Sequence, residues 1–239
     1  MKFYRPITKI KAISFDLDDT LYDNHPVIMR AEQGLQTYLN QHYPHAANLG
    51  KEAQGAIKQH LIKQDKRLAS DMGELRRQTL RAMLSSSTLS DAEIEDAVTG
   101  CFNLFYRLRS DVKINKTVYS CLSRLKEIVP IVAITNGNID TQVTGFDDYF
   151  EFTLHASLAF PRKPYPDMFL EAARRLNCQP EEILHVGDGL INDVYGAYKA
   201  GFQTAWLAVN RPMLLNNEPT IVLPHVQLDT LNELITLMT

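Results

Sequence analysis

The sequence has few cysteines, no basic block and no long hydrophobic run. Its three cysteines, Cys101, Cys121 and Cys178, are widely spaced and include no CxxC pair, which argues against a disulfide framework and against a zinc site. The first residues, MKFYRPITKIKAISF, are interrupted by charged side chains, so they do not resemble the apolar core of a signal peptide. No later stretch approaches the length of a membrane span. We therefore expect a protein of the reducing cytoplasm with no membrane partner.

Neither positive nor negative side chains are in large excess. The 239 residues include 25 Lys and Arg against 28 Asp and Glu, which gives a formal net charge of -3. Because the basic residues are not clustered, nothing in the sequence indicates a nucleic acid or an anionic membrane as a partner. The chain is long enough to form one large domain or two smaller ones, each with its own core.

The region from about residue 27 to residue 109 is predicted to be helical almost throughout. It is rich in Ala, Leu, Glu, Gln, Lys and Arg, and its apolar residues recur at helical spacing. Breaks at HYPHAANLG and SSSTLSDAE divide it. After the second break, Ser90 followed by Glu93 is typical of a capping box that begins a helix.

Outside this region, short apolar runs alternate with helical patterns, and five of these runs are predicted to be strands: Ala12–Phe15, Val129–Thr135, Phe152–Ala156, Ile183–Val186 and Thr204–Val209. Helices are expected at Lys116–Glu127, at Asp167–Leu176 with Asp167 as N-cap, at Asp193–Ala200 with Gly201 at its C-terminal end, and near the C-terminus, where Leu231, Leu234, Ile235 and Met238 share one face.

This alternation predicts an α/β fold with a Rossmann-like parallel sheet covered by helices on both faces. Residues 1–23 and 108–239 are expected to form the α/β core, and residues 24–107 an inserted all-helical cap domain. In such sheets ligands bind beyond the carboxyl ends of the strands. Polar clusters follow several of the predicted strands, so these clusters are the candidate functional sites.

The first cluster, FDLDDT, places Asp16, Asp18 and Asp19 directly after a strand. If the strand continues, Asp16 and Asp18 share a face and point into one pocket. A calcium-binding EF-hand loop also begins with DxD, but it requires Gly at the sixth position and Glu at the twelfth, where this chain has Leu21 and Val27. Crowded carboxylates repel one another, so the cluster calls for a cation.

The second and third clusters are ITNGN, with Thr135 and Asn136, and PRKPYPDMF, with Lys163. Asn-Gly alone is most often a hairpin turn. At a strand end, however, a hydroxyl and backbone N–H groups can hold phosphate oxygens. A lone Lys is usually a solvated surface charge, although prolines beside Lys163 favour a fixed position ahead of a helix.

The fourth cluster, GDGLINDVYGA, also follows a predicted strand. A dinucleotide-binding GxGxxG pattern requires Gly at the position of Asn192, so that interpretation fails. The cluster instead supplies two carboxylates, Asp188 and Asp193. Asp193 alone could be a favourable charge at the start of a helix, whereas Asp188 has no such structural role.

Together, FDLDDT, ITNGN, KPYPDMF and GDGLINDVYGA resemble, in order and context, the four motifs of the haloacid dehalogenase-like hydrolase superfamily. The helical insert lies where that family has its cap. The resemblance implies a phosphomonoester hydrolase of small molecules that acts through an aspartyl-phosphate. It implies that Asp16 is the nucleophile and that Asp18 is the general acid, and then the base that activates water.

The resemblance also implies the remaining site residues. Phosphoryl oxygens would be held by Thr135, Asn136 and Lys163, while Asp16, Asp188 and the backbone carbonyl of Asp18 would bind Mg²⁺. Asp193 would orient Lys163 or a metal-bound water. Elementary electrostatics agrees: two like charges about 4 Å apart repel by roughly 4 kcal/mol at an effective dielectric near 20, and Mg²⁺ with Lys163 would relieve this repulsion.

Two departures from the family pattern are Tyr165 and Gly189, where many relatives have acidic or small polar residues. Other functions stay open. A sugar-phosphate phosphatase or phosphomutase would share the same catalytic set. A haloacid dehalogenase needs no acid at the position of Asp18, and a non-catalytic binding protein would be expected to lack one of the carboxylates.

The substrate is expected to contact the cap. Tyr22, Asn24 and His25 lead into it and are candidates to line the pocket, although a solvent-facing His25 is the simpler expectation. Phe102, Phe105 and Tyr106 could stack on a flat ring or belong to the core. The opening FYRPI and the late LPH resemble bacterial flavin mononucleotide phosphatases of riboflavin synthesis, which also act on the ribitylamino-uracil phosphate precursor.

Overall fold

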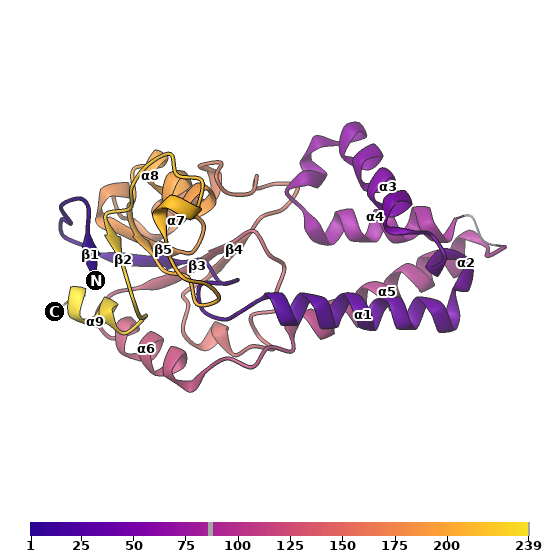
Figure 1. The fold of residues 1–239 in the computed structure, drawn as a ribbon, viewed down its shortest axis with the longest axis horizontal. Coiled ribbons are helices and arrows are strands. Elements are labelled where there is room, and N and C mark those ends of the chain that lie inside the picture. The colour runs from indigo at the N-terminus through magenta and orange to yellow at the C-terminus, as the bar shows by residue number, and fades with distance from the viewer. Residues whose placement is uncertain (86–87, 239) are drawn as a thin grey trace.

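The computed structural model describes residues 1–85 and 88–238, and these form two lobes (Figure 1). One lobe contains the sheet and both ends of the described chain, and the other consists of helices. The fold is α/β, as predicted. The helices are α1 (His25–His42), α2 (Pro44–Ala47), α3 (Lys51–Gln64), α4 (Met72–Leu84), α5 (Asp91–Ser110), α6 (Lys116–Lys126), α7 (Asp167–Leu176), α8 (Gly196–Lys199) and α9 (Glu233–Met238).

Within the described residues the sheet has seven strands in the order β1-β7-β6-β5-β2-β3-β4. The strands are β1 (Lys2–Phe3), β2 (Ala12–Phe15), β3 (Ile131–Thr135), β4 (Thr153–His155), β5 (Ile183–Gly187), β6 (Gln203–Trp206) and β7 (Val226–Gln227). All neighbouring pairs are parallel except β1 and β7. Strand β2 lies between β3 and β5, so the ends of these three strands meet at one edge.

Helices cover both faces of the sheet. Ile13 and Phe15 of β2 join a buried cluster with residues of α6 and α9, and Ala12 joins a second cluster with residues of α7 and α8. This alternation is the period-two pattern of a strand that is buried on both faces. Figure 1 shows the same arrangement, with α7 and α8 on one side of the strands and α6 and α9 on the other.

Strands β3 and β6 differ most from the predicted bounds, whereas those of β4 and β5 differ by no more than one residue at either end. Strand β3 begins at Ile131 rather than Val129, because Pro130 has no N–H to donate to the ladder, although its carbonyl accepts the Ile13 N–H at 3.1 Å. Strand β6 ends at Trp206, and the chain beyond it crosses to the loop after β2, where the Val209 N–H donates to the Asp19 carbonyl at 2.9 Å.

The helix ends are partly as predicted. The capping box of Ser90 and Glu93 is confirmed at the start of α5, and Gly201 has the left-handed φ of 92° expected just beyond the end of α8. The N-cap assigned to Asp167 is wrong, because Pro166 holds that position and Asp167 is already in the first turn of α7. The helix expected at Asp193 begins earlier, as a π-helical turn over Leu190–Tyr195 that leads into α8.

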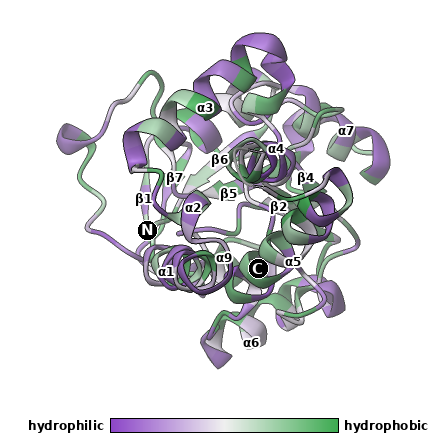
Figure 2. Ribbon diagram, turned by 90° about the vertical axis from the view of Figure 1, so that its right-hand side faces the viewer, coloured by the Kyte–Doolittle hydropathy of each residue, from purple (hydrophilic) through white to green (hydrophobic). Residues whose placement is uncertain are grey.

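The helical lobe has its own core. Residues of α1, α2, α4 and α5 form a buried cluster that includes Phe102 and Phe105, and Figure 2 shows the hydrophobic sides of these helices facing one another. Of the break predicted at SSSTLSDAE, Ser86 and Ser87 lie outside the described residues. The division of the chain at residues 23–24 and 107–108 stays a prediction, and helix α5 itself continues to Ser110.

Candidate active site

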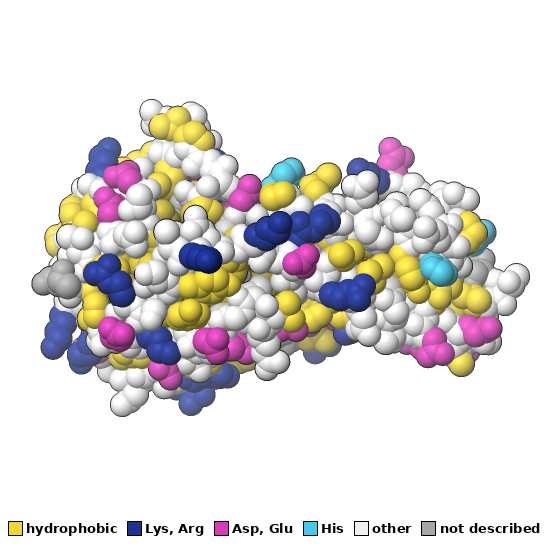
Figure 3. Space-filling model, turned by 90° about the horizontal axis from the view of Figure 1, so that it is seen from below, with side chains coloured by type: hydrophobic (Ala, Val, Ile, Leu, Met, Phe, Trp, Pro, Cys, Tyr) yellow, Lys and Arg dark blue, Asp and Glu magenta, His cyan; other side chains and the backbone are white. Residues whose placement is uncertain are grey.

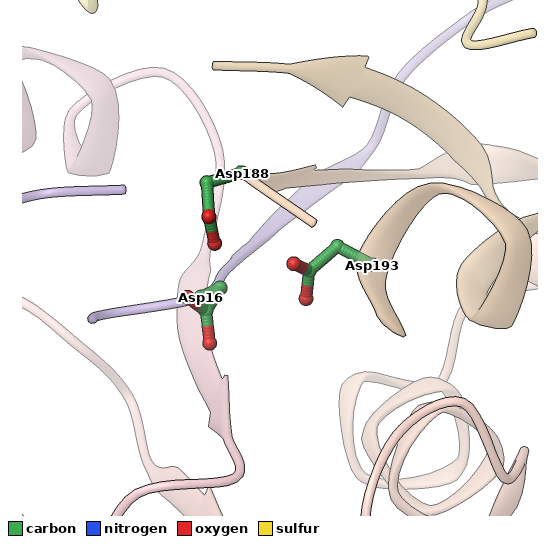
Figure 4. A group of neighbouring side chains, drawn as sticks. All are labelled: Asp16, Asp188 and Asp193. Carbon is green, nitrogen blue, oxygen red and sulfur yellow. The ribbon is translucent and has the colours of Figure 1, made fainter. Parts of the chain in front are cut away.

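The sheet topology brings three of the polar clusters together. Asp16 follows β2, Thr135 ends β3, and Asp188 follows β5, so all three lie at the carboxyl edge of adjacent parallel strands. Asp193 comes from the helical turn after β5, and Figure 4 shows its carboxylate facing those of Asp16 and Asp188. Carboxylate oxygens of Asp16, Asp188 and Asp193 all lie within 4.8 Å of one another.

Lys163 lies at the centre of this group. Its Nζ donates to Oδ1 of Asp16 at 2.6 Å, to Oδ1 of Asp193 at 2.6 Å and to the carbonyl of Ile134 at 2.8 Å. The side chain is 1% exposed, so Lys163 is not a solvated surface charge. Burial opposes its charge, but the neighbouring carboxylates of Asp16 and Asp193 outweigh this effect and raise the pKa of Lys163, which is therefore an ammonium at neutral pH.

Both carboxylate oxygens of Asp193 have hydrogen-bond partners within the protein. Its Oδ1 accepts from Lys163 and lies 3.2 Å from Nε2 of His185, and its Oδ2 accepts the Gly189 N–H at 2.8 Å. Burial raises the pKa of this carboxyl, but the charge of Lys163 together with His185 lowers it below its usual value. Gly187 must lack a side chain, because a Cβ there would lie 2.4 Å from Cγ of Asp193. These contacts are those of a residue that orients Lys163.

The pKa values of Asp16 and Asp188 are raised, whereas that of Asp193 is lowered. Burial raises the pKa of Asp16 well above its usual value, and although Lys163 lowers it, the charges of Asp193 and Asp188 raise it further. Burial and the charge of Asp193 raise the pKa of Asp188 to about 7. Asp16 and Asp193 thus share one buried ammonium, and the third carboxylate, Asp188, lies beside them with its own cation, Arg211. The oxygen-only donor set and the excess negative charge fit a divalent cation such as Mg²⁺.

Thr135 and Asn136 shape the loop after β3. Oγ of Thr135 accepts the Gly137 N–H at 3.0 Å. The side-chain amide of Asn136 accepts the backbone N–H of Lys163 at 2.7 Å and donates to its carbonyl at 3.1 Å, so this side chain positions Lys163. The segment is not a hairpin turn, because β3 pairs in parallel with both β2 and β4.

Asp18 contacts two residues that the sequence pattern did not assign to it. Nη2 of Arg109, from the last turn of α5, donates to Oδ1 and Oδ2 of Asp18 at 2.6 and 2.8 Å. The hydroxyl of Tyr22 donates to Oδ1 of Asp18 and accepts from Nη1 of Arg109 at 3.3 Å. Tyr22 was expected to line the pocket. Arg109 was missed because its partner is 91 residues away in the sequence.

Asp188 is likewise held by residues outside the motifs. Arg211 donates to Oδ2 of Asp188 and to its backbone carbonyl, which also accepts from Nε1 of Trp206 at 2.7 Å. Arg211 in turn contacts Glu218. No sequence signal distinguishes Arg211 from other loop arginines, and only the tertiary fold brings it to the strand end.

Two cavities lie between the lobes, and Asp18 lines the smaller one. A cavity of about 220 Å³ is lined by Asp18, Asn24, Phe105 and Arg109 among others, and a larger cavity of about 490 Å³ is lined by residues that include Phe102 and Tyr106. Both are also lined by Asn138. The rings of Phe102 and Tyr106 are stacked with their centroids 5.8 Å apart.

Of the residues that lead into the cap, Asn24 lines the smaller cavity and His25 lies at the surface. Among the described residues, Oδ1 of Asn24 is a buried acceptor without a hydrogen-bond partner. His25 is exposed, as expected.

The junction of the lobes is also visible from outside, where Figure 3 shows basic and hydrophobic side chains gathered on one face. Within the described ranges, no helix combines the length and apolarity needed to cross a membrane.

The chain is similar to hydrolases along its whole length. The sequence model described as haloacid dehalogenase-like hydrolase matches residues 10–201. The 5-amino-6-(5-phospho-D-ribitylamino)uracil phosphatase YigB of Escherichia coli is 34% identical over 238 residues, which cover 100% of both chains. A glyceraldehyde 3-phosphate phosphatase of Methanopyrus kandleri is 26% identical and covers 82% of each chain.

Solved structures show the same architecture. A 2-haloacid dehalogenase from Pseudomonas syringae superposes with a TM-score of 0.87 at 31% identity and covers 96% of this chain and 98% of its own. The magnesium-bound hydrolase YfnB of Bacillus subtilis superposes with a TM-score of 0.63 at 20% identity, and 97% and 99% of the two chains are covered.

Proposed function

The chain belongs to the haloacid dehalogenase-like hydrolase family and is a phosphoric monoester hydrolase, and we propose that it acts through a phosphoaspartate formed on Asp16. The observation that carries this proposal is the place of Lys163, which is buried between Asp16 at the end of β2 and Asp193 in the helical turn after β5. A buried cation beside a strand-end carboxylate offsets the repulsion between that carboxylate and an incoming phosphate.

In the first half of the proposed reaction, a carboxylate oxygen of Asp16 attacks phosphorus, and the bond to the leaving oxygen breaks. Lys163 stabilises the charge on the phosphoryl oxygens, while Asn136 and Asp193 hold Lys163 in place through its backbone and its ammonium. Asp18 is the proposed donor of a proton to the leaving oxygen, and its position in the lining of the 220 Å³ cavity supports this role.

In the second half, water attacks the phosphoaspartate and Asp18 accepts its proton. Asp16, Asp188 and the backbone carbonyl of Asp18 would hold Mg²⁺, as the donor set and the charge of the site suggest. When bound, the ion supplies positive charge that brings phosphate and carboxylate together. Asp193 is assigned to the orientation of Lys163, because its Oδ1 accepts from the ammonium and its Oδ2 is held by the Gly189 N–H.

The proposed substrate is a phosphate ester with a hydroxylated chain and a flat ring, such as flavin mononucleotide or the ribitylamino-uracil phosphate of riboflavin biosynthesis. The full-length similarity to the Escherichia coli ribitylamino-uracil phosphatase supports this choice. The smaller cavity offers the buried acceptor Oδ1 of Asn24 for a hydroxyl donor. The larger one offers the partly exposed ring of Tyr106.

A dehalogenase function is the alternative suggested by the printed name of the Pseudomonas syringae neighbour. A carboxyl at position 18 that faces the cavity argues against it, because carbon–halogen cleavage needs no proton for the leaving group. A phosphomutase would share the carboxylates of this site and would return the phosphoryl group to a second sugar hydroxyl.

The experiment is a panel of flavin mononucleotide, the ribitylamino-uracil phosphate, sugar phosphates and a 2-haloacid, assayed with Mg²⁺ and with a chelator. We expect release of inorganic phosphate that requires Mg²⁺ and Asp16, with the highest kcat/KM for the two ring-bearing esters. Asp167→Asn, an exposed carboxylate in α7, is the matched control for Asp16→Asn. Halide release, or phosphate release that survives in Asp16→Asn, would contradict the chemistry. Preference for sugar phosphates would contradict the substrate class alone.

A further inference from the structure

Arg109 connects the helical lobe to the acid–base residue. It lies in the last turn of α5, and its side chain is 3% exposed. Its Nη2 contacts both oxygens of Asp18, at 2.6 and 2.8 Å, in the wall of the smaller cavity. The last turn of α5 therefore contacts Asp18, the residue that takes part in both proton transfers of the proposed reaction.

In each of these contacts Asp18 accepts a hydrogen bond. A guanidinium has no acceptor, so Arg109 can only donate to the carboxyl group. The hydroxyl of Tyr22 likewise donates to Oδ1 of Asp18. This geometry suits an ionised Asp18 that is about to receive a proton, which is its state before the second half of the proposed reaction.

The backbone of the loop after β3 packs closely against Asp18 and Arg109. A Cβ at Gly137 would lie 2.5 Å from Oδ2 of Asp18 and 3.0 Å from Nη2 of Arg109. Only glycine leaves room for this close approach of the backbone. The contact between Asp18 and Arg109 is thus bounded by the cap helix, by Tyr22 from the loop after β2, and by the backbone of the loop after β3.

We propose that Arg109 is a positioning residue for the second half of the reaction, in which it and Tyr22 hold Asp18 as the proton acceptor. The inference rests on the phosphoaspartate of the proposed function. One O–H bond of water breaks and its proton goes to Asp18, while the water oxygen bonds to phosphorus. The phosphorus–oxygen bond to Asp16 then breaks, and its electron pair returns to the Asp16 carboxylate. Because Arg109 is carried by the cap, the position of the cap decides whether Asp18 is held.

The test separates the two halves of the reaction with p-nitrophenyl phosphate, whose leaving group needs no proton. In Arg109→Gln we expect a burst of one equivalent of p-nitrophenol per site. The steady phase that follows should be slower by about tenfold to hundredfold, because general base catalysis is impaired. Rapid acid quench should trap the phosphoenzyme. Arg107→Gln, an exposed arginine two residues earlier in α5, should behave as the wild type.

Two further variants keep the test decisive. Arg109→Lys retains a cation near Asp18 and should recover part of the slow phase, and Tyr22→Phe should show a burst with a smaller loss. A wild-type rate of phosphoenzyme decay in Arg109→Gln overturns the inference, as does a raised KM with unchanged decay, which would assign Arg109 to substrate binding. If circular dichroism shows that Arg109→Gln is unfolded, the same decay measurement on Tyr22→Phe decides. Absence of any phosphoenzyme in the wild type overturns the proposed function and the inference with it.

Discussion

Arg211 donates from Nη1 to Oδ2 of Asp188 at 2.8 Å and from Nη2 to the backbone carbonyl of the same residue at 3.0 Å. Glu218 accepts from the same guanidinium at 3.1 and 2.9 Å, so a neighbouring carboxylate balances the charge of Arg211. Arg211 thus fixes the direction of the Asp188 side chain while adding little net charge beside the proposed metal site.

The first prediction follows from this contact. Arg211→Gln should weaken Mg²⁺ binding by about tenfold, because residues that orient metal ligands typically contribute tenfold to hundredfold in affinity. The measurement is the Mg²⁺ concentration that produces half of the maximal thermal stabilisation, which needs no substrate. Arg174→Gln, whose partner Glu171 is in the same surface helix, is the control. Equal or tighter Mg²⁺ binding in Arg211→Gln would show that Arg211 does not orient the ligand.

The second prediction concerns the nucleophile. Asp16→Asn should lower kcat by at least about 10³-fold, because loss of a covalent nucleophile removes the main reaction path. The fold should survive, since the amide removes a buried charge and keeps nearly the same shape. Steady-state kinetics and thermal unfolding measure the two effects. Near-normal turnover in Asp16→Asn would remove this residue from the nucleophile role.

The third prediction concerns the buried ion pairs of Lys163. Lys163→Met should lower the free energy of unfolding by roughly 3–5 kcal/mol, because Asp16 and Asp193 lose their cation in a buried site. The double variant with Asp193→Asn should be less destabilised than the sum of the two single variants. Urea unfolding in the presence of a chelator measures both, with the exposed Lys116→Met as control. Strict additivity would contradict a direct interaction.

The fourth prediction is a pH dependence caused by Asp188. Its pKa is raised from 3.8 to about 7 in the folded protein, so the native state binds this proton more tightly than the unfolded state does. The resulting stabilisation is fully present below about pH 4 and is lost as the pH rises to about 7.

Without metal, wild type should therefore lose about 1 kcal/mol of unfolding free energy per pH unit in this window, relative to Asp188→Asn. Groups that do not interact with Asp188, such as His185, cancel in this difference, whereas the variant also removes the Asp188 charge that raises the pKa of Asp16. Urea unfolding at several pH values in a chelator provides the measurement, and added Mg²⁺ should stabilise wild type more than the variant. A difference that does not change with pH would show that the pKa of Asp188 is not raised.

Much of the sheet and of the carboxylate cluster could be predicted from sequence, because both depend on local pattern. Strand β2 is a run of four buried residues that leads directly to Asp16, and its ends are as expected. Asp188 follows β5 in the same way. Parallel strands must then bring these carboxylates to one edge, so their proximity follows from the fold class.

Strands β1 and β7, which lie together at one side of the sheet, were not predicted because they carry little pattern. Strands β1 and β7 have two residues each and exist through their pairing, in which Lys2 lies opposite Gln227 and Phe3 opposite Val226. The N-cap at Asp167 failed for a local reason, since Pro166 already occupies that position and the helix begins directly after it.

Residues that act through tertiary contacts were the main omission. Arg109 and Arg211 contact Asp18 and Asp188 from helix α5 and from the loop after β6, and no spacing rule connects them to the motifs. Asn136 was expected to bind phosphate, but its side chain holds the backbone of Lys163. A buried arginine in the last turn of a helix is recognisable only once its burial is known.

The insertion of the cap between β2 and β3 has an evolutionary consequence. The chain leaves the sheet after Tyr22 and returns near Asp111, and Arg30 at the start of the cap donates to the carbonyl of Asp111, so the two crossing points lie side by side. A module joined in this way can be exchanged between relatives without disturbing the strand order. Here the exchange is restricted, because a transplanted cap would also have to supply a guanidinium for Asp18.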